Sequence, residues 1–155
     1  MKCRLLKIYL PLLLAALVTG CTGLMGASQP LNFTPTTFAT GEYTARADNF
    51  QLILDASQTM ANNGQVNFLT AKNFLGAVNQ SLPADFDANV GLRSYGHSEQ
   101  QSKAITELVA PMAGYSRDAI RQGLDKVKYA GGNSPLGAAI DAASADLEKT
   151  SGPAV

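Results

Sequence analysis

The sequence has few charged residues, only two cysteines and no tryptophan. Its 155 residues include 12 Lys plus Arg and 12 Asp plus Glu, and 15% of residues are charged against 46% hydrophobic. This balance excludes a disordered chain, a coiled coil and a basic nucleic-acid-binding arm. Cys3 and Cys21 are too few for a disulfide-stapled scaffold or a four-ligand zinc site. The length suits about one domain.

The first twenty residues have the three-part layout of a secretory signal. A basic start at residues 2–7 precedes an apolar run from Ile8 to Val18 and the small residues Thr19 and Gly20. The run is shorter than the roughly 20 residues that span a bilayer. We therefore predict a signal peptide over residues 1–20, with a short membrane anchor as the alternative.

The end of this segment, LVTGC at residues 17–21, resembles the bacterial lipobox. The resemblance implies that Cys21 becomes the lipidated first residue of the mature protein, held at a membrane surface by its acyl chains. Thr22, in place of Asp, implies the outer membrane of a bacterial cell envelope. The alternative is ordinary secretion with a free Cys21. Cleavage removes three basic and no acidic residues, so the mature chain has a net charge of −3.

Residues 21–48 are rich in Thr, Gly, Ser and Pro, which predicts a tether and a lead-in segment. Phe33, Phe38 and Tyr43 either fix this lead-in to the domain or are isolated turn aromatics, and the sequence leaves both open.

From Asn49 onward, strand and helix patterns alternate. Phe50–Leu54, Ala88–Tyr95 and Thr106–Met112 are predicted strands, and Pro111 places the third at a sheet edge. Apolar residues spaced by three and four predict a helix over 66–82.

Two further helices are predicted to begin near Ser116, as an N-cap, and at Ser134-Pro135. The last of these carries an apolar stripe at Leu136, Ile140, Ala143 and Leu147. The alternation predicts an α/β fold with helices on both faces of a sheet, whose ligands bind at the carboxyl ends of the strands.

A cluster of oxygen-bearing residues follows the first predicted strand directly. Asp55, Ser57 and Thr59 supply one carboxylate and two hydroxyls at alternate positions. Such hard oxygen ligands suit Mg²⁺, which retains several waters. The same residue types are also common in turns, so this pattern alone is a weak signal.

A second element, GGNSPLG at residues 131–137, makes the pattern more specific. Together the two motifs resemble the von Willebrand factor A (VWA) domain, whose two loops build a metal-ion-dependent adhesion site (MIDAS). The resemblance implies a Rossmann-like fold with a central, mostly parallel sheet. It also implies that Asp55, Ser57, Thr59 and Ser134 ligate Mg²⁺ or another divalent cation such as Ca²⁺ or Mn²⁺.

The resemblance covers residues 49–155 and implies the N-terminal part of a VWA domain. The family's third ligand loop, after its fourth strand, is not in the sequence. We therefore expect a C-terminally truncated domain with an incomplete sheet, its later strands absent and a vacant position beside its first strand. The lipobox and domain motifs together resemble bacterial envelope lipoproteins, in which an OmpA-like domain downstream attaches to peptidoglycan.

The expected function is therefore that of a binding module and not of an enzyme: a partner protein supplies a carboxylate to the bound metal. Nucleic acid is excluded as a partner by the acidic mature chain. Asp55-x-Ser57-x-Thr59 also resembles the Asp-x-Asp-x-Thr motif of aspartate-nucleophile phosphatases, but Ser57 replaces their acid–base residue. A structural envelope lipoprotein with a vestigial metal site is a third hypothesis. His97, the only histidine, is expected to be a solvated loop residue near the site.

Overall fold

The computed structural model describes residues 28–41, 43 and 45–155. The predicted signal peptide and Cys21 lie outside these residues. The elements, in chain order, are β1 (Asn49–Asp55), the short 3₁₀ helix η2 (Gln58–Ala61), α2 (Asn62–Ser81), β2 (Asn89–Tyr95), β3 (Thr106–Gly114), α3 (Arg117–Lys126) and α4 (Leu136–Leu147). None of the helices in this part of the chain is long and apolar enough to cross a membrane.

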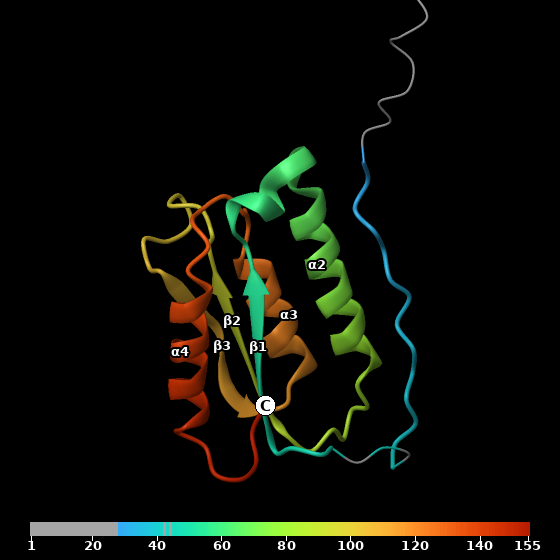
Figure 1. The fold of residues 1–155 in the computed structure, drawn as a ribbon. Helices are drawn as coiled ribbons and strands as arrows, with labels where there is room; N and C mark the ends of the chain where they lie inside the picture. Colours follow the sequence, from blue (N-terminus) through green and yellow to red (C-terminus); the bar gives the residue numbers. More distant parts are fainter. Residues whose placement is uncertain (1–27, 42, 44) are drawn as a thin grey trace, which may run out of the picture.

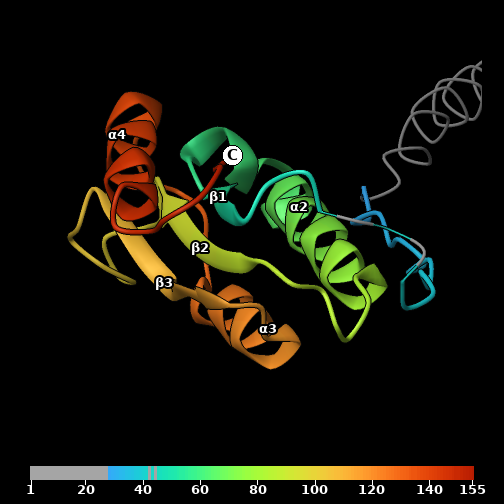
Figure 2. The same cartoon turned by 90° about the horizontal axis from the view of Figure 1, so that it is seen from below.

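The strands form a sheet in the order β1-β2-β3 (Figure 1). β1 and β2 are parallel, and β3 pairs antiparallel with β2. Helices α2 and α3 cover one face, and α4 covers the other (Figure 2). The predicted α/β fold with helices on both faces is therefore confirmed. Pro111 lies in the outer strand β3, where a missing N–H is tolerated.

The main core lies between the sheet and helices α2 and α3. Its innermost side chains are fully buried: Phe68, Leu54, Leu92, Val109 and Val127. Residues 63–65 of α2 have φ between 54° and 73°, so the regular helix begins only at about the predicted start, Val66. The predicted apolar stripe of this helix does face the core at Phe68, Ala71 and Leu75.

The face that helix α4 presents to the sheet agrees only in part with the predicted stripe. Its buried residues are Ala139, Ala143 and Asp146, whereas Leu136 and Ile140 are 48% and 49% exposed. Ala143 was predicted to be buried and is, whereas the prediction was wrong for Leu136 and Ile140 and did not include Ala139 or Asp146. Alanines allow the helix to approach the sheet closely, and a buried ion pair between Asp146 and Arg93 fixes its rotation.

The last residues pair with the beginning of β1. Val155 N donates to Asn49 O at 2.9 Å, and Gln51 N donates to Val155 O at 3.0 Å. Ala154 forms a parallel bridge with Asn49, whose buried side-chain amide donates to Ser151 O at 2.8 Å. The expectation of a vacant position beside the first strand was therefore wrong for the start of β1, because residues 153–155 satisfy its backbone groups.

Residues 28–41, which we call the strap, run alongside α2 (Figure 1). Leu31 N donates to Thr70 Oγ1 at 3.0 Å, and Thr36 N donates to Ser81 Oγ at 2.9 Å. The Phe33 ring meets Phe74 of α2 edge to face, with 5.4 Å between ring centroids. Phe33 therefore fixes the lead-in segment to the domain, whereas Phe38 and Tyr43 pack on each other.

Candidate metal centre

The first loop of the predicted site turns sharply at the carboxyl end of β1. Asp55 Oδ1 accepts a hydrogen bond from Ser57 N at 2.7 Å, which curls the loop back on its own carboxylate. Ser57 Oγ lies 3.2 Å from Thr59 Oγ1. Ser57 is 1% exposed, Asp55 is half-buried and Thr59 is exposed. The three predicted ligand residues therefore lie within one turn of chain, from the base of the site to its surface.

The second loop lies directly beside the first. Gly131 N donates to Ala56 O at 2.9 Å, and Gln58 N donates to Gly132 O at 2.8 Å. These two bonds hold residues 131–134 against the first loop as in a short parallel ladder. The exposed Ser134 thus lies at the same edge of the sheet as Asp55, although 79 positions separate them in the sequence.

Tyr95 connects the two loops at the end of β2. It lies opposite Asp55 in the parallel register and is 5% exposed. Burial raises the pKa of the Tyr95 hydroxyl, and a hydrogen bond to Asp55 and the charge of Asp55 raise it further, whereas a hydrogen bond with Ser134 lowers it. The neutral hydroxyl therefore links the first and second loops.

Tyr95 was not among the residues predicted for the site. The sequence pattern predicted Tyr95 only as the last residue of a strand. Its place at the site could have been predicted from strand ends. Tyr95 and Asp55 end two adjacent parallel strands and so meet at one edge of the sheet.

Gly96 occupies the point where β2 and both loops meet. Its φ is 69°, in the left-handed region. A Cβ at this position would lie 2.6 Å from Asn133 O and 2.7 Å from Ser57 Cα. Only glycine fits this backbone conformation and this spacing without displacing a loop.

His97 is buried and not solvated as the sequence predicted. It is 5% exposed, and its backbone bridges to Ala130. Its two ring nitrogens have no hydrogen-bond partner among the residues that the structure describes. The prediction was wrong because the second loop packs over the end of β2: a Cβ on Gly132 would lie 2.4 Å from His97 O.

An open cavity of about 830 Å³ adjoins the first loop at this edge. Its lining includes Gln58, His97, Lys103, Ile105 and Asn133. Gln58 stands between two of the predicted ligand residues in the sequence, so the cavity borders the first loop, although none of the four predicted ligands lines it.

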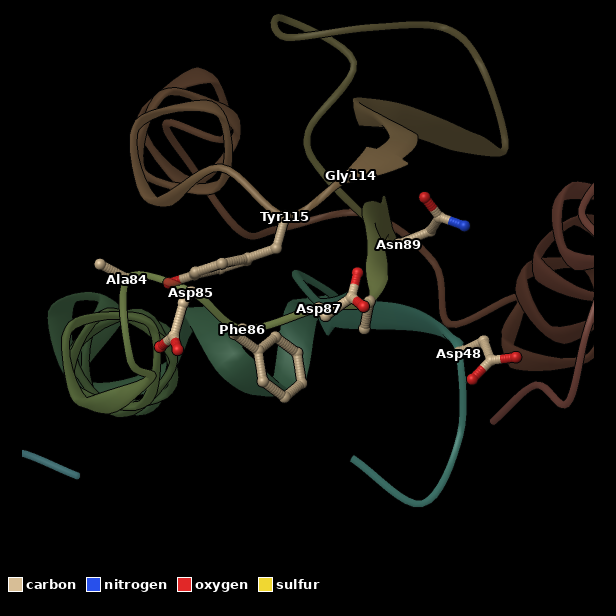
Figure 3. A pocket seen from close by; sticks show the side chains of 9 residues that line it. Asp48, Ala84, Asp85, Phe86, Asp87, Asn89, Gly114 and Tyr115 are labelled. Carbon is tan, nitrogen blue, oxygen red and sulfur yellow. The ribbon is translucent and has the colours of Figure 1, made fainter. Parts of the chain in front are cut away.

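A second cavity lies at the opposite edge of the sheet (Figure 3). Asp48, Asp85 and Asp87 line it together with Phe86 and Tyr115. Figure 3 shows the three carboxylates spread along the rim and not directed at one point. The opposite edge is therefore acidic without forming a cation cage.

The donor set at the candidate site fits a hard divalent cation. Within residues 28–155, apart from the undescribed 42 and 44, no three His, Cys, Asp or Glu side chains are grouped to hold a metal. A cation at the first loop therefore depends on the Asp55 carboxylate, hydroxyl oxygens and water. That set suits Mg²⁺ and lacks the nitrogen and sulfur ligands typical of zinc sites.

Comparison with known proteins identifies the family. A family model for the von Willebrand factor type A domain matches residues 50–154, a range that contains the sheet and both loops. No curated protein and no solved structure matches the chain. Domains of this family are generally protein-interaction modules, often dependent on a divalent cation. The chain belongs to the von Willebrand factor type A domain family.

Proposed function

We propose that this chain is the cation-dependent, protein-binding module of a bacterial envelope lipoprotein. The observation that carries the proposal is the pairing of two distant loops around one carboxylate. Backbone hydrogen bonds at 2.8 and 2.9 Å hold residues 131–134 beside the Asp55 loop. This arrangement brings hydroxyl oxygens from both loops to the edge where Asp55 ends β1.

In this proposal Asp55, Ser57, Thr59 and Ser134 hold Mg²⁺, with Ca²⁺ or Mn²⁺ as substitutes. The cation neutralises Asp55 and leaves an open position for a carboxylate of the partner protein. A charge-assisted contact of this kind, partly shielded from water, anchors an interface and makes it specific. No bond is broken, so the proposed activity is binding and not catalysis.

The adjoining cavity provides room for the partner residues on either side of that carboxylate. Gln58, Asn133 and Lys103 offer hydrogen-bond donors along its wall. The cation supplies the anchor, and these polar groups contribute discrimination between partners.

The proposed location is the cell envelope, with Cys21 acylated and the domain tethered to the outer membrane. The lipobox-like stretch supports this location. An OmpA-like domain encoded downstream would attach the protein to peptidoglycan.

Binding of Mn²⁺ to the full chain, followed by electron paramagnetic resonance, tests the metal site. Asp55→Ala is expected to weaken Mn²⁺ binding at least about tenfold, because it removes the only carboxylate of the donor set. Asp85→Ala, at the acidic opposite edge, is the matched control and should bind Mn²⁺ normally. Circular dichroism checks that both variants are folded.

Equal Mn²⁺ binding by wild type and Asp55→Ala would contradict the proposed site. Absence of binding in the folded wild type would favour a structural lipoprotein with a vestigial site. The phosphatase alternative gains no support from the geometry. Ser57, at the position of the phosphatase acid–base group, is a buried hydroxyl.

A further inference from the structure

The strap enters the domain at the edge that carries the candidate metal site. In Figure 1 the first described residues lie level with η2, and the strap then runs beside α2 toward the opposite edge, where β1 begins. Leu31 contacts Thr70, and Thr36 contacts Ser81, so strap and helix run in the same direction. The start of the strap therefore lies close to the start of α2. That helix follows the first loop of the candidate metal site directly in the sequence.

The lengths of the helix and of the extended strap support this position for the start of the strap. Thr70 lies four positions beyond Val66, where the regular helix begins, which corresponds to a helical rise of about 6 Å. The three residues from Ser28 to Leu31 span about 10 Å when extended. Ser28 therefore lies near the first loop when positions are compared along the axis of α2.

The upper part of the strap is fixed by several contacts. Asn73 Nδ2 donates at 2.9 Å both to Leu31 O and to Asn32 Oδ1. Phe33 adds its edge-to-face contact with Phe74. These contacts determine where the chain leaves the domain on its way to Cys21.

We infer that the lipid anchor turns the metal edge toward the bilayer, so that this surface meets carboxylates presented at the membrane by a protein of the same membrane. The inference rests on the proposed acylation of Cys21 and the proposed metal site. The seven residues from Cys21 to Ser28 reach at most about 25 Å. The opposite edge is farther by about 24 Å, the length of the regular part of α2 from Val66 to Ser81.

The charge distribution supports the same orientation independently. Asp48, Asp85 and Asp87 line the opposite edge, as Figure 3 shows. An anionic lipid surface repels acidic groups within about a Debye length of roughly 10 Å. At the metal edge, Lys103 and Glu99 of the cavity offset each other, and a bound cation would outweigh the charge of Asp55, so this edge meets less repulsion. Attachment point and charge therefore favour one orientation.

With the metal edge facing the bilayer, a partner anchored in the same membrane is favoured over a soluble one. A partner anchored in the same membrane meets the metal edge at high effective concentration, because both are confined to one surface. A soluble protein lacks this gain in effective concentration. The chemistry expected of the partner is thus an acidic side chain on a segment close to the bilayer surface.

Quenching by lipid headgroups tests the orientation. The full chain is purified with its lipid and reconstituted in vesicles that contain phosphatidylglycerol and a nitroxide-headgroup lipid. The same fluorophore is attached to Ala104→Cys, beside the metal-edge cavity, or to Ala84→Cys, at the opposite edge; both alanines are exposed. We expect at least about twofold stronger quenching at position 104, given the α2 length between the edges.

A second preparation separates this inference from the anchor itself. Cys21→Ser with a histidine tag placed before residue 21 is bound to nickel-chelating lipid, which keeps the attachment point without acylation. Mass spectrometry of the native chain reports separately whether Cys21 is acylated. Equal quenching at positions 84 and 104, or stronger quenching at 84, in the tagged protein would overturn the orientation whatever the state of Cys21. A flexible Gly/Ser spacer of about 30 residues between Ala27 and Ser28 is expected to reduce the difference.

Discussion

Arg93 on β2 donates from both Nε, at 3.0 Å, and Nη2 to the same carboxylate oxygen of Asp146 on α4. The two side chains are 10% and 6% exposed. Thr106 Oγ1 accepts from Arg93 Nη1 at 3.4 Å, and Lys149 pairs with the second oxygen of Asp146. This network fixes α4 on the sheet, and α4 begins two residues after Ser134, so the ion pair also supports the second loop.

The first prediction concerns this ion pair. Asp146→Ala is expected to lower the free energy of unfolding by about 3–5 kcal/mol, because the Arg93 charge remains buried without its partner. The double variant Arg93→Met/Asp146→Leu should recover much of the loss, since neither charge is then buried. Urea denaturation measures all three proteins.

The exposed pair of Arg121 and Asp118 provides the control for the first prediction. Their side chains are 59% and 78% exposed. Asp118→Ala should change stability by less than about 1 kcal/mol. A double variant at 93 and 146 no more stable than Asp146→Ala alone would contradict the assignment of the cost to the unpaired charge.

The second prediction concerns the junction at Gly96. Gly96→Ala is expected to cost about 2–4 kcal/mol, from the left-handed φ and from contacts with Asn133 O and Ser57 that force the loops apart. Mn²⁺ affinity should fall in the same variant. Thermal unfolding and Mn²⁺ titration are the measurements.

Gly137 is the matched glycine for this comparison. It lies in α4, and a Cβ there would meet nothing within 4 Å. Gly137→Ala should leave stability unchanged or raise it by about 0.5–1 kcal/mol. If Gly96→Ala behaved like Gly137→Ala, the described convergence of the loops would be incorrect.

The third prediction concerns the strap. Asn73→Ala removes two hydrogen bonds to Leu31 and Asn32, and Phe33→Ala removes the contact with Phe74. Each is expected to increase the rate of proteolysis within residues 28–41 while lowering global stability by only about 1 kcal/mol. Asn67→Ala, exposed on the same helix, should cleave like wild type. Equal strap cleavage in all four proteins would show that these contacts do not hold the strap.

The fourth prediction concerns pH. Lys72 donates to Val127 O at 2.9 Å and lies 5.5 Å from the centre of the Phe68 ring. Burial, and to a lesser extent the charge of Lys128, lower the pKa of Lys72 below 10.5, with Asp125 acting in the opposite direction. Between this lowered pKa and 10.5 the unfolded chain binds more protons than the folded one, so this residue makes the free energy of unfolding rise with pH.

The measurement for Lys72 is urea denaturation of wild type and Lys72→Met across the alkaline range. Met keeps the aliphatic stem but does not titrate. The stability of wild type relative to the variant is expected to increase as pH approaches 10.5. A relative stability that stays constant or decreases would contradict the half-buried environment of Lys72.

Much of the fold could be predicted because apolar periodicity reports burial directly. The strands around Leu54 and Leu92 and the helix around Phe68 follow from that signal. Ser116 caps α3 as predicted, with its hydroxyl accepting from Ala119 N at 3.3 Å. These features depend on residues close together in sequence, so the sequence contains the necessary information.

The features that the sequence did not predict depend on contacts between residues that are distant along the chain. The rotation of α4 is set by Asp146 meeting Arg93 across 53 positions. The burial of His97 follows from the approach of the second loop, and the link through Tyr95 follows from strand register. The docked strap relies on single polar contacts such as Asn73 with Leu31, which leave no periodic pattern.

The pairing of residues 151–155 with the start of β1 has a consequence for how the chain folds. Asn49 donates to Ser151 O across 102 positions, and the adjacent backbone pairs with residues 153–155. The buried amide of Asn49 has these partners only when residues 151–155 have reached it. Closing so long a loop is entropically costly, and contacts of large sequence separation slow folding. The start of β1 therefore gains these partners only when residues 151–155 have reached it, whereas the pairing of β1 with β2 does not depend on them.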